Sequence, residues 1–400
     1  MSEAGDAALL REESTSQRAS FLELFLDLVF VFALTRVSQR LITDFTSEQR
    51  ILLPEAGQTL LLFLALWIVW TTTVWATSRL DPEAPQVQVV VILTLIGSMV
   101  MAVALPEGFG DRALVFAGAY VATQVGRSMY FLVATHRQGD KAVSLRIIFW
   151  AGVSGVPWIV GGLLADEPLR GLLWTVAVVL DLSALALGWP TPRLGRSWFG
   201  GELLSAEHLA ERYQQFLIIA LGESIFVLGL TFSSSDFTVD QATAFGLGLL
   251  TTVLLWRIYF HRAGRVLPLA ITSARNPGRL GVATAFTHLT MIAGIVLTGV
   301  GYELSIAHPL GHGDPAWLFA ILGGPILFLT GRTPFEFQVF GRISPSRVAG
   351  ILVLAAPIPA LLHAPPLAAS GTAAGVLVGV AVLDALRSRG RSPESPAPPI

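Results

Sequence analysis

Long apolar runs alternate with short polar connections along nearly the whole chain. Twelve of these runs are long enough to cross a bilayer as helices, which takes about 20 residues. Pro157 falls within the fifth run, and Pro357 and Pro359 fall within the eleventh, so helix ends are poorly marked there. The pattern predicts an all-α membrane protein with spans near residues 21–41, 58–78, 86–106, 113–135, 145–165, 169–189, 212–232, 241–260, 281–302, 315–331, 346–363 and 367–387.

The second half of the chain repeats the first. The run Asp27–Thr35 (Asp-Leu-Val-Phe-Val-Phe-Ala-Leu-Thr) returns 196 positions later as Glu223–Thr231 (Glu-Ser-Ile-Phe-Val-Leu-Gly-Leu-Thr), again with an acid in first place. Similar offsets relate three further features in the same order: Gly126-Arg127 to Gly331-Arg332, Pro157 to Pro357, and Asp181 to Asp384. These matches predict a duplicated six-span unit. Because six is an even number, the two copies would share one orientation about an axis along the membrane normal.

The chain is therefore expected to contain two parallel six-helix membrane repeats, at residues 21–189 and 207–387. A linker at residues 190–206 joins them. The segment 1–20 and the tail 388–400 flank them, and the Pro-rich tail is expected to be disordered.

Basic residues predict the orientation. If the termini and every second loop lie on one side, that side holds 20 of the 26 Lys and Arg residues, whereas the other side holds five. Since cytoplasmic loops are enriched in Lys and Arg, both termini are expected in the cytoplasm. The polar first 20 residues lack a signal-peptide core, so insertion is expected to begin with the first span.

Composition supports membrane insertion and excludes several classes of function. The chain is 53% hydrophobic and 14% charged, with a mean hydropathy of +0.65. It has no cysteine, which excludes disulfides and thiol catalysis, and no nucleotide-binding loop or hydrolase motif. His308 and His312 lie in a Gly/Pro-rich loop that is a poor metal site. We therefore expect no enzymatic activity, cofactor, metal or nucleic-acid partner.

Charged residues within the apolar runs are the candidates for function, because a carboxylate in hydrocarbon costs several kcal/mol. Helix rise predicts that they form one layer in the cytoplasmic half, with an acid, an arginine and a second acid from each repeat. The residues are Asp27, Arg127 and Asp181 in the first repeat, and Glu223, Arg332 and Asp384 in the second. In one interpretation, Asp27–Arg127 and Glu223–Arg332 are structural ion pairs. In the other, the layer binds a cation or proton.

Two further residues, Glu23 and His288, could serve function or structure, and one glycine ridge is expected to be structural. Glu23 lies near the cytoplasmic boundary, either as an interfacial carboxylate or at the entrance to a cation or proton path through that layer. His288 lies deep in a span, either as a proton relay or as a packing residue. A ridge of small residues, Gly371, Gly375 and Gly379, predicts close helix packing.

Two stretches resemble the signatures of the bacterial low temperature requirement A family. Glu23–Phe32 (Glu-Leu-Phe-Leu-Asp-Leu-Val-Phe-Val-Phe) is similar to its "ELFFDLVFVF" run, with Leu26 in place of the second Phe. The "H-x-x-ER…GES" run is represented by His208, Glu211, Arg212, Gly222, Glu223 and Ser224. The resemblance implies a bacterial inner-membrane protein linked to growth in the cold, but it supplies no biochemical activity. From the sequence, the His208–Arg212 stretch caps its helix, or it gates or binds a ligand.

Two functions follow from these features. The first is a channel or secondary transporter that moves a cation, proton or small solute past the intramembrane acids. The alternative is a non-transporting sensor, scaffold or lipid-interacting protein, whose buried charges only hold the helices together. The oligomeric state stays open.

Overall fold

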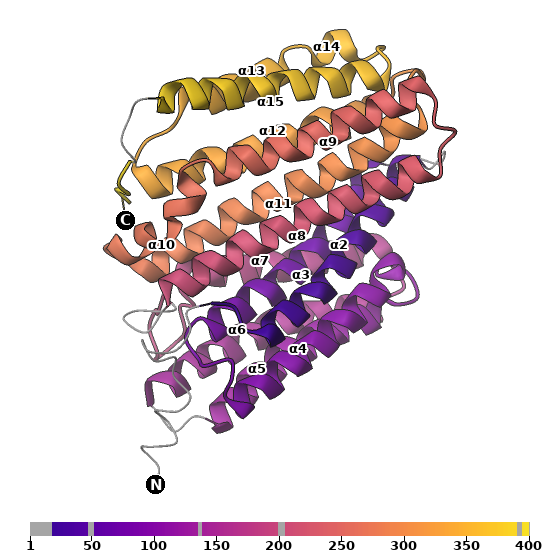
Figure 1. Cartoon of the computed structure of the whole chain (residues 1–400). Helices are drawn as coiled ribbons and strands as arrows, with labels where there is room; N and C mark the ends of the chain where they lie inside the picture. The colour runs from indigo at the N-terminus through magenta and orange to yellow at the C-terminus, as the bar shows by residue number, and fades with distance from the viewer. Residues whose placement is uncertain (1–17, 47–51, 135–137, 199–204, 390–393, 400) are drawn as a thin grey trace. The chain divides into compact units, whose positions relative to one another are not determined.

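The computed structural model describes residues 18–46, 52–134, 138–198, 205–389 and 394–399 (Figure 1). Within these ranges the regular elements are helices, and no strand is formed. Most of the predicted segment 1–20, residues 199–204 of the linker and part of the tail lie outside the described residues.

Nine helices of the described chain are long and apolar enough to cross a membrane, which confirms a polytopic membrane protein. Two expected spans are less apolar. Helix α2 (Phe21–Thr46) carries five charged residues, and the apolar run of α5 (Ala113–Ala134) is interrupted by Gln124 and Arg127. The eleventh expected span is broken at its prolines, so α13 (Pro345–Ala355) is followed by the short α14 (Ile358–Leu361).

The chain divides into two compact units. Unit 1 contains most of α3 (Leu52–Thr77), all of α4 (Pro85–Ala104), η1 (Leu105–Glu107) and α5, and all of α6 (Gln138–Leu163) and α7 (Glu167–Leu187). Helices α4, α5, α6 and α7 pack in sequence order, each on the next (Figure 1). The Trp158 and Trp174 rings, 4.8 Å apart between centroids, fill the core between α6 and α7.

Unit 2 contains α9 (Val239–Phe260), α10 (Ala263–Ser273), α12 (Pro315–Phe340), α13, α14 and α15 (Pro366–Ser388). Helix α15 packs against α9, α12 and α13 (Figure 1). Besides the first residue of α3, three helices contribute residues to both units: α2, α8 (Ala206–Ser233) and α11 (Pro277–Ala307).

Helix ends follow local sequence signals. Asp166 caps α7 by accepting from the Leu169 backbone N–H at 3.0 Å, and Gly188 ends that helix in the left-handed region. Asp314 caps α12 in the same way, and Gly341 ends it with a φ of 66°.

Close helix packing occurs at different glycines from those predicted. A Cβ placed on Gly324 of α12 would lie 2.4 Å from Thr298 Oγ1 on α11, so these two helices touch through their backbones. By contrast, no atom of the described residues lies within 4 Å of a Cβ built on Gly375 or Gly379. The ridge predicted on α15 is therefore wrong as a close contact, because small residues alone do not say which face meets a neighbour.

Candidate functional site

Asp27 on α2 forms a buried ion pair with Arg212 on α8. The two guanidinium nitrogens donate to the two carboxylate oxygens at 2.6 and 2.8 Å, which is the bidentate geometry of a strong charge-assisted pair. The indole N–H of Trp70 on α3 also donates to Asp27, at 3.1 Å. Both charged side chains are at most 2% exposed. The Asp27 charge is therefore fully compensated.

Glu23 lies one helical turn before Asp27 and joins the same cluster. Ser20 donates to its carboxylate through both backbone N–H and hydroxyl, while the Glu23 N–H donates back to Ser20 Oγ, which forms a capping box at the start of α2. His208 Nε2 lies 3.1 Å from Glu23 Oε1, and His208 Nδ1 lies 2.9 Å from the Ser78 hydroxyl. Glu23 is thus a helix-capping carboxylate buried in an ion-pair cluster.

These contacts fix how α2 and α8 run past each other in unit 1. Glu23 meets His208 and Asp27 meets Arg212, each pair separated by 185 positions. Because the partner number rises with the residue number, the two helices are parallel there. The first two turns of both helices thus bring Glu23 and Asp27 of the first motif to His208 and Arg212 of the second.

Arg127 is not the partner of Asp27, so this predicted pair is wrong. It donates instead to Thr73 Oγ1 at 2.7 Å and to Gln124 Oε1 at 2.5 Å. Asp181 likewise accepts from the Tyr120 hydroxyl at 2.6 Å. Helix rise predicts similar depths for these residues, but it does not predict which sides of their helices face each other.

Glu223 on α8 is the other acid that the sequence repeat identified, and its surroundings differ from those of Asp27. It is 0% exposed, and neither carboxylate oxygen has a hydrogen-bond partner among the described residues. The Ser38 hydroxyl lies beside it without reaching hydrogen-bond geometry. Gly299 of α11 packs against the same spot, since a Cβ there would lie 3.9 Å from Glu223 Oε2. The predicted Glu223–Arg332 pair is therefore wrong.

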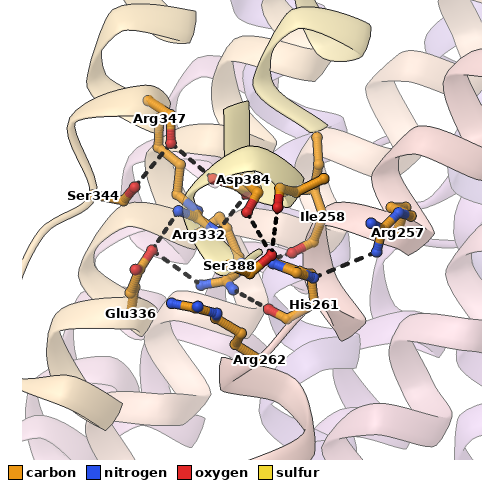
Figure 2. A network of polar contacts seen from close by, with 12 residues as sticks. Arg257, Ile258, His261, Arg262, Arg332, Glu336, Ser344, Arg347, Asp384 and Ser388 are labelled. Atoms are coloured by element: carbon orange, nitrogen blue, oxygen red, sulfur yellow. Dashed lines mark hydrogen bonds and ion pairs between the residues drawn. The ribbon is translucent and has the colours of Figure 1, made fainter. Parts of the chain in front are cut away.

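Arg332 belongs to a separate network in unit 2, shown in Figure 2. It donates to the backbone carbonyls of Ile258 and His261 at the end of α9, where the helix dipole favours a cation. Glu336, one turn later on α12, lies 3.9 Å from Arg332 and 2.6 Å from Arg347.

Asp384 of α15 completes the buried part of this network. It accepts from Arg347 at 3.0 Å and from the Ser346 hydroxyl at 2.9 Å. Arg347 thus bridges two acids from two helices, as Figure 2 shows. Two buried arginines and two buried carboxylates balance, so the network is a structural tie between α12, α13 and α15.

The described part of the tail contacts the exposed edge of the network. Glu394 accepts from Arg342 Nε at 2.7 Å and lies 3.3 Å from an Arg262 nitrogen, and Ala397 N–H donates to the Val339 carbonyl. Hydrogen bonds to Glu394 raise the pKa of the Arg342 guanidinium, so it stays charged.

His288 on α11 uses both ring nitrogens. Nε2 lies 2.7 Å from the Tyr259 hydroxyl, and Nδ1 lies 2.9 Å from the Thr284 carbonyl. A carbonyl only accepts, so Nδ1 carries the proton and Nε2 accepts from tyrosine. The Tyr213 and Phe335 rings enclose the imidazole. This is the geometry of a packing histidine.

The remaining motif residues lie on α8. Glu211 is half-buried, Gly222 is exposed with open space around it, and the Ser224 hydroxyl donates to the Leu221 carbonyl. The described residues contain no group of three or more His, Asp or Glu placed to hold a metal.

Comparison with known proteins identifies the family. The model of the bacterial low temperature requirement A protein matches residues 18–382, nearly the whole chain. The chain belongs to this family. A relative from Rhizobium meliloti (strain 1021), named "Uncharacterized protein RA0937", is 40% identical over 354 residues, which cover 87% of this chain and 84% of the relative. No solved structure matches.

Several side-chain contact partners in this member of the family were not predicted from the sequence. The Ser20-x-x-Glu23 pattern is a capping-box signature that could have been recognised from spacing alone. Glu336 lies one turn after Arg332, so this i, i+4 ion pair could also have been predicted from the sequence. Trp70, Gln124 and Tyr120 carried no such signal, because their roles depend on how separate helices pack.

Proposed function

We propose that this protein is a multi-pass protein of the bacterial cytoplasmic membrane that carries or conducts a proton, or another cation or small solute, with Glu223 as the working carboxyl group. The observation that supports the proposal most is the burial of Glu223 without a hydrogen-bond partner among the described residues. An isolated carboxylate in a low-dielectric environment is strongly disfavoured. Glu223 must therefore be neutral, or charged only while a cation accompanies it.

The other candidate acids fit this role less well. Asp27 is held by Arg212, Asp384 by Arg347, and Glu23 by its cap and by His208. A carboxylate locked to an arginine gives up its charge only at a cost of several kcal/mol. Exchange of a cation or proton is easiest at the acid that has no fixed counter-charge.

The position of Glu223 along its helix favours transport. Eleven residues separate it from Arg212 on α8, which corresponds to about 16 Å of helix rise. Helix α8 has 28 residues and ends at Ser233, so Glu223 lies more than two helical turns from either end. Coupling sites of secondary transporters lie near the bilayer midplane.

The local chemistry favours a proton over a metal cation. Hard cations need several oxygen ligands. Beside Glu223, the described residues place only two other side-chain oxygens, the hydroxyls of Ser38 and Ser224, which is fewer ligands than a hard cation requires. A proton needs only the carboxylate itself.

The parallel course of α2 and α8 in unit 1 supports the proposed topology. Parallel helices enter the membrane from the same side, which requires an even number of crossings from one to the next. Six spans per repeat and cytoplasmic termini satisfy this requirement, as does the distribution of Lys and Arg. We include two parallel six-helix repeats in the proposal on this basis.

A non-transporting role is the alternative, and the completeness of the Asp27–Arg212 and Arg347–Asp384 pairing favours it. Helix-register pairs of this kind need no cargo. The alternative predicts that the wild-type protein passes no ion and that Glu223→Gln changes nothing but stability.

Flux in proteoliposomes separates the two. Purified protein is reconstituted with a pH-sensitive dye inside, and a pH gradient is imposed with valinomycin and potassium present to compensate charge. With an acidic outside solution, we expect the dye to report acidification of the lumen with wild type and no acidification with Glu223→Gln. Glu303→Gln, at a half-buried acid of α11, is the matched control and should retain flux.

Two outcomes would overturn the proposal at different levels. If wild type moves neither protons nor sodium, potassium or small solutes supplied as gradients, the transport function is wrong. If flux is present but Glu223→Gln retains it, transport stands and the site is wrong.

A further inference from the structure

A groove of about 490 Å³ runs between α4 and α5 in unit 1. Its volume is in the range of small-molecule binding pockets. Gly118, Ala122 and Gly126 on α5 hollow it out, since their missing or minimal side chains leave that helix surface bare, whereas Gly97 on α4 is covered by the Thr123 side chain. The remaining walls are mostly apolar. A second hollow of about 370 Å³ shares Val100 and Val115 with the first and extends along the same helices. We call the two together the α4–α5 groove.

A buried arginine lies at one end of the groove. Arg127 lines it and is 6% exposed. Its guanidinium donates to two neutral acceptors, Thr73 Oγ1 and Gln124 Oε1. No carboxylate of the described chain lies within 4.0 Å of it, unlike Arg212, Arg332 and Arg347, each of which has an acidic neighbour. The groove therefore carries a net positive charge at membrane depth, which is costly without an anion.

A second polar group in the groove lacks a partner. Thr94 of α4 lines the same wall and is 1% exposed. Its hydroxyl has no hydrogen-bond partner in the described part of the structure, whereas the neighbouring Thr123 hydroxyl bonds the Ala119 carbonyl. A buried hydroxyl without a partner costs free energy that a bound ligand atom would recover. Thr94 and Arg127 thus both indicate a polar ligand group at this end.

We propose that the α4–α5 groove binds one anionic amphiphile, with its acidic head at Arg127 and Thr94 and its acyl chain along the apolar wall. A planar guanidinium binds phosphate and carboxylate oxygens with paired hydrogen bonds. The glycine-lined wall toward Val100 and Val115 has the apolar surface that an acyl chain requires. The head belongs either to an anionic phospholipid or to a free fatty acid, which share this chemistry.

The site is independent of the proposed proton path. Glu223 and its neighbours belong to unit 2, whereas every residue of the groove belongs to unit 1. Loss of lipid binding in an Arg127 variant would not bear on flux, and loss of flux in a Glu223 variant would not bear on the groove.

Ligand-dependent thermal stability of the full chain in a neutral detergent tests the proposal. The probes are phosphatidylglycerol, phosphatidylcholine with the same acyl chains, oleate and inorganic phosphate. We expect stabilisation at lower concentration by phosphatidylglycerol or oleate than by phosphatidylcholine, and none by inorganic phosphate. Comparison of phosphatidylglycerol with oleate distinguishes a phospholipid from a fatty acid.

Two kinds of variant test head and chain separately. Arg127→Gln should weaken the anionic ligand by about tenfold or more and leave phosphatidylcholine unchanged, because it removes a charge-assisted contact. Arg127→Lys should retain part of the preference. Gly126→Leu should weaken all chain-bearing ligands, and it should fold, since no atom in the described part of the chain lies within 4 Å of a Cβ at Gly126.

Three results would overturn the proposal. One is equal stabilisation by anionic and zwitterionic lipids, and another is unchanged anionic binding in a folded Arg127→Gln protein. The third is a change of oligomeric state in Gly126→Leu with lipid binding intact, which would make the groove an interface between copies of the chain.

Discussion

The Asp27–Arg212 pair gives a sharp test of the structure. Removing one partner of a buried ion pair leaves a charge in a low-dielectric environment and costs about 3–5 kcal/mol. Both side chains here are almost fully buried and doubly hydrogen-bonded, so we expect costs in that range for Asp27→Leu and for Arg212→Met. Asp27→Leu also removes the acceptor of Trp70, which adds about 1 kcal/mol.

The double variant should lose far less than the sum of the two single losses. With both charges gone, no uncompensated ion remains between α2 and α8, and apolar side chains of similar size fill the space. We therefore expect a coupling free energy of at least about 3 kcal/mol from the double-mutant cycle. The free energy of unfolding is measured in mixed detergent micelles from tryptophan fluorescence.

A second cycle provides the control. Arg127 lies in the same unit but contacts Thr73 and Gln124 in place of Asp27, so Asp27→Leu and Arg127→Met should be additive. Additivity in the Asp27–Arg212 cycle would show that this ion pair does not form. Strong coupling in the Asp27–Arg127 cycle would show that Asp27 pairs with Arg127, as helix depth predicts.

Two further stability changes are expected. Gly324→Ala should cost about 1–3 kcal/mol in the same unfolding assay, because the new Cβ would lie 2.6 Å from the Thr298 backbone nitrogen and force α11 and α12 apart; an unchanged stability would refute that close approach. Glu394→Ala should cost less than about 1 kcal/mol, since its arginine partners are partly exposed and surface pairs contribute little; a melting temperature far below wild type would show that the tail holds unit 2 together.

Much of the fold was readable from the sequence because a membrane leaves few choices. Backbone polar groups in hydrocarbon must bond within their own segment, so long apolar runs become helices. Pro357 lies between α13 and α14, in the expected span whose helix ends were poorly marked, and Asp166 and Gly188 lie at helix ends where such residues are expected. The charged and polar residues of α2 and α5 explain why these two expected spans are not among the nine helices apolar enough to cross a membrane.

The site was predictable only in part. The acids on α2 and α8 were found because charge in an apolar run is conspicuous. Their partners were not found, because depth along a helix gives one coordinate, whereas pairing also depends on rotation about the helix axis. Asp27 and Arg127 show this limit, since their predicted levels agree and their partners differ.

The difference between Asp27 and Glu223 follows from two different offsets. In the sequence repeat, matching residues differ by 196 in number. In the contacts between α2 and α8 at Glu23 and Asp27, the partners differ by 185. On α8, the residue opposite Asp27 is therefore Arg212, and Glu223 comes eleven residues later. At an offset of 185, the residue matched to Glu223 is Ser38, the hydroxyl that lies beside it. One copy of the acid thus has an arginine within reach, and the other has only a neutral side chain.

Duplication alone would give two equivalent acids. Because the contacts between α2 and α8 do not follow the repeat, the protein instead has one fixed ion pair at Asp27 and one uncompensated carboxyl group at Glu223.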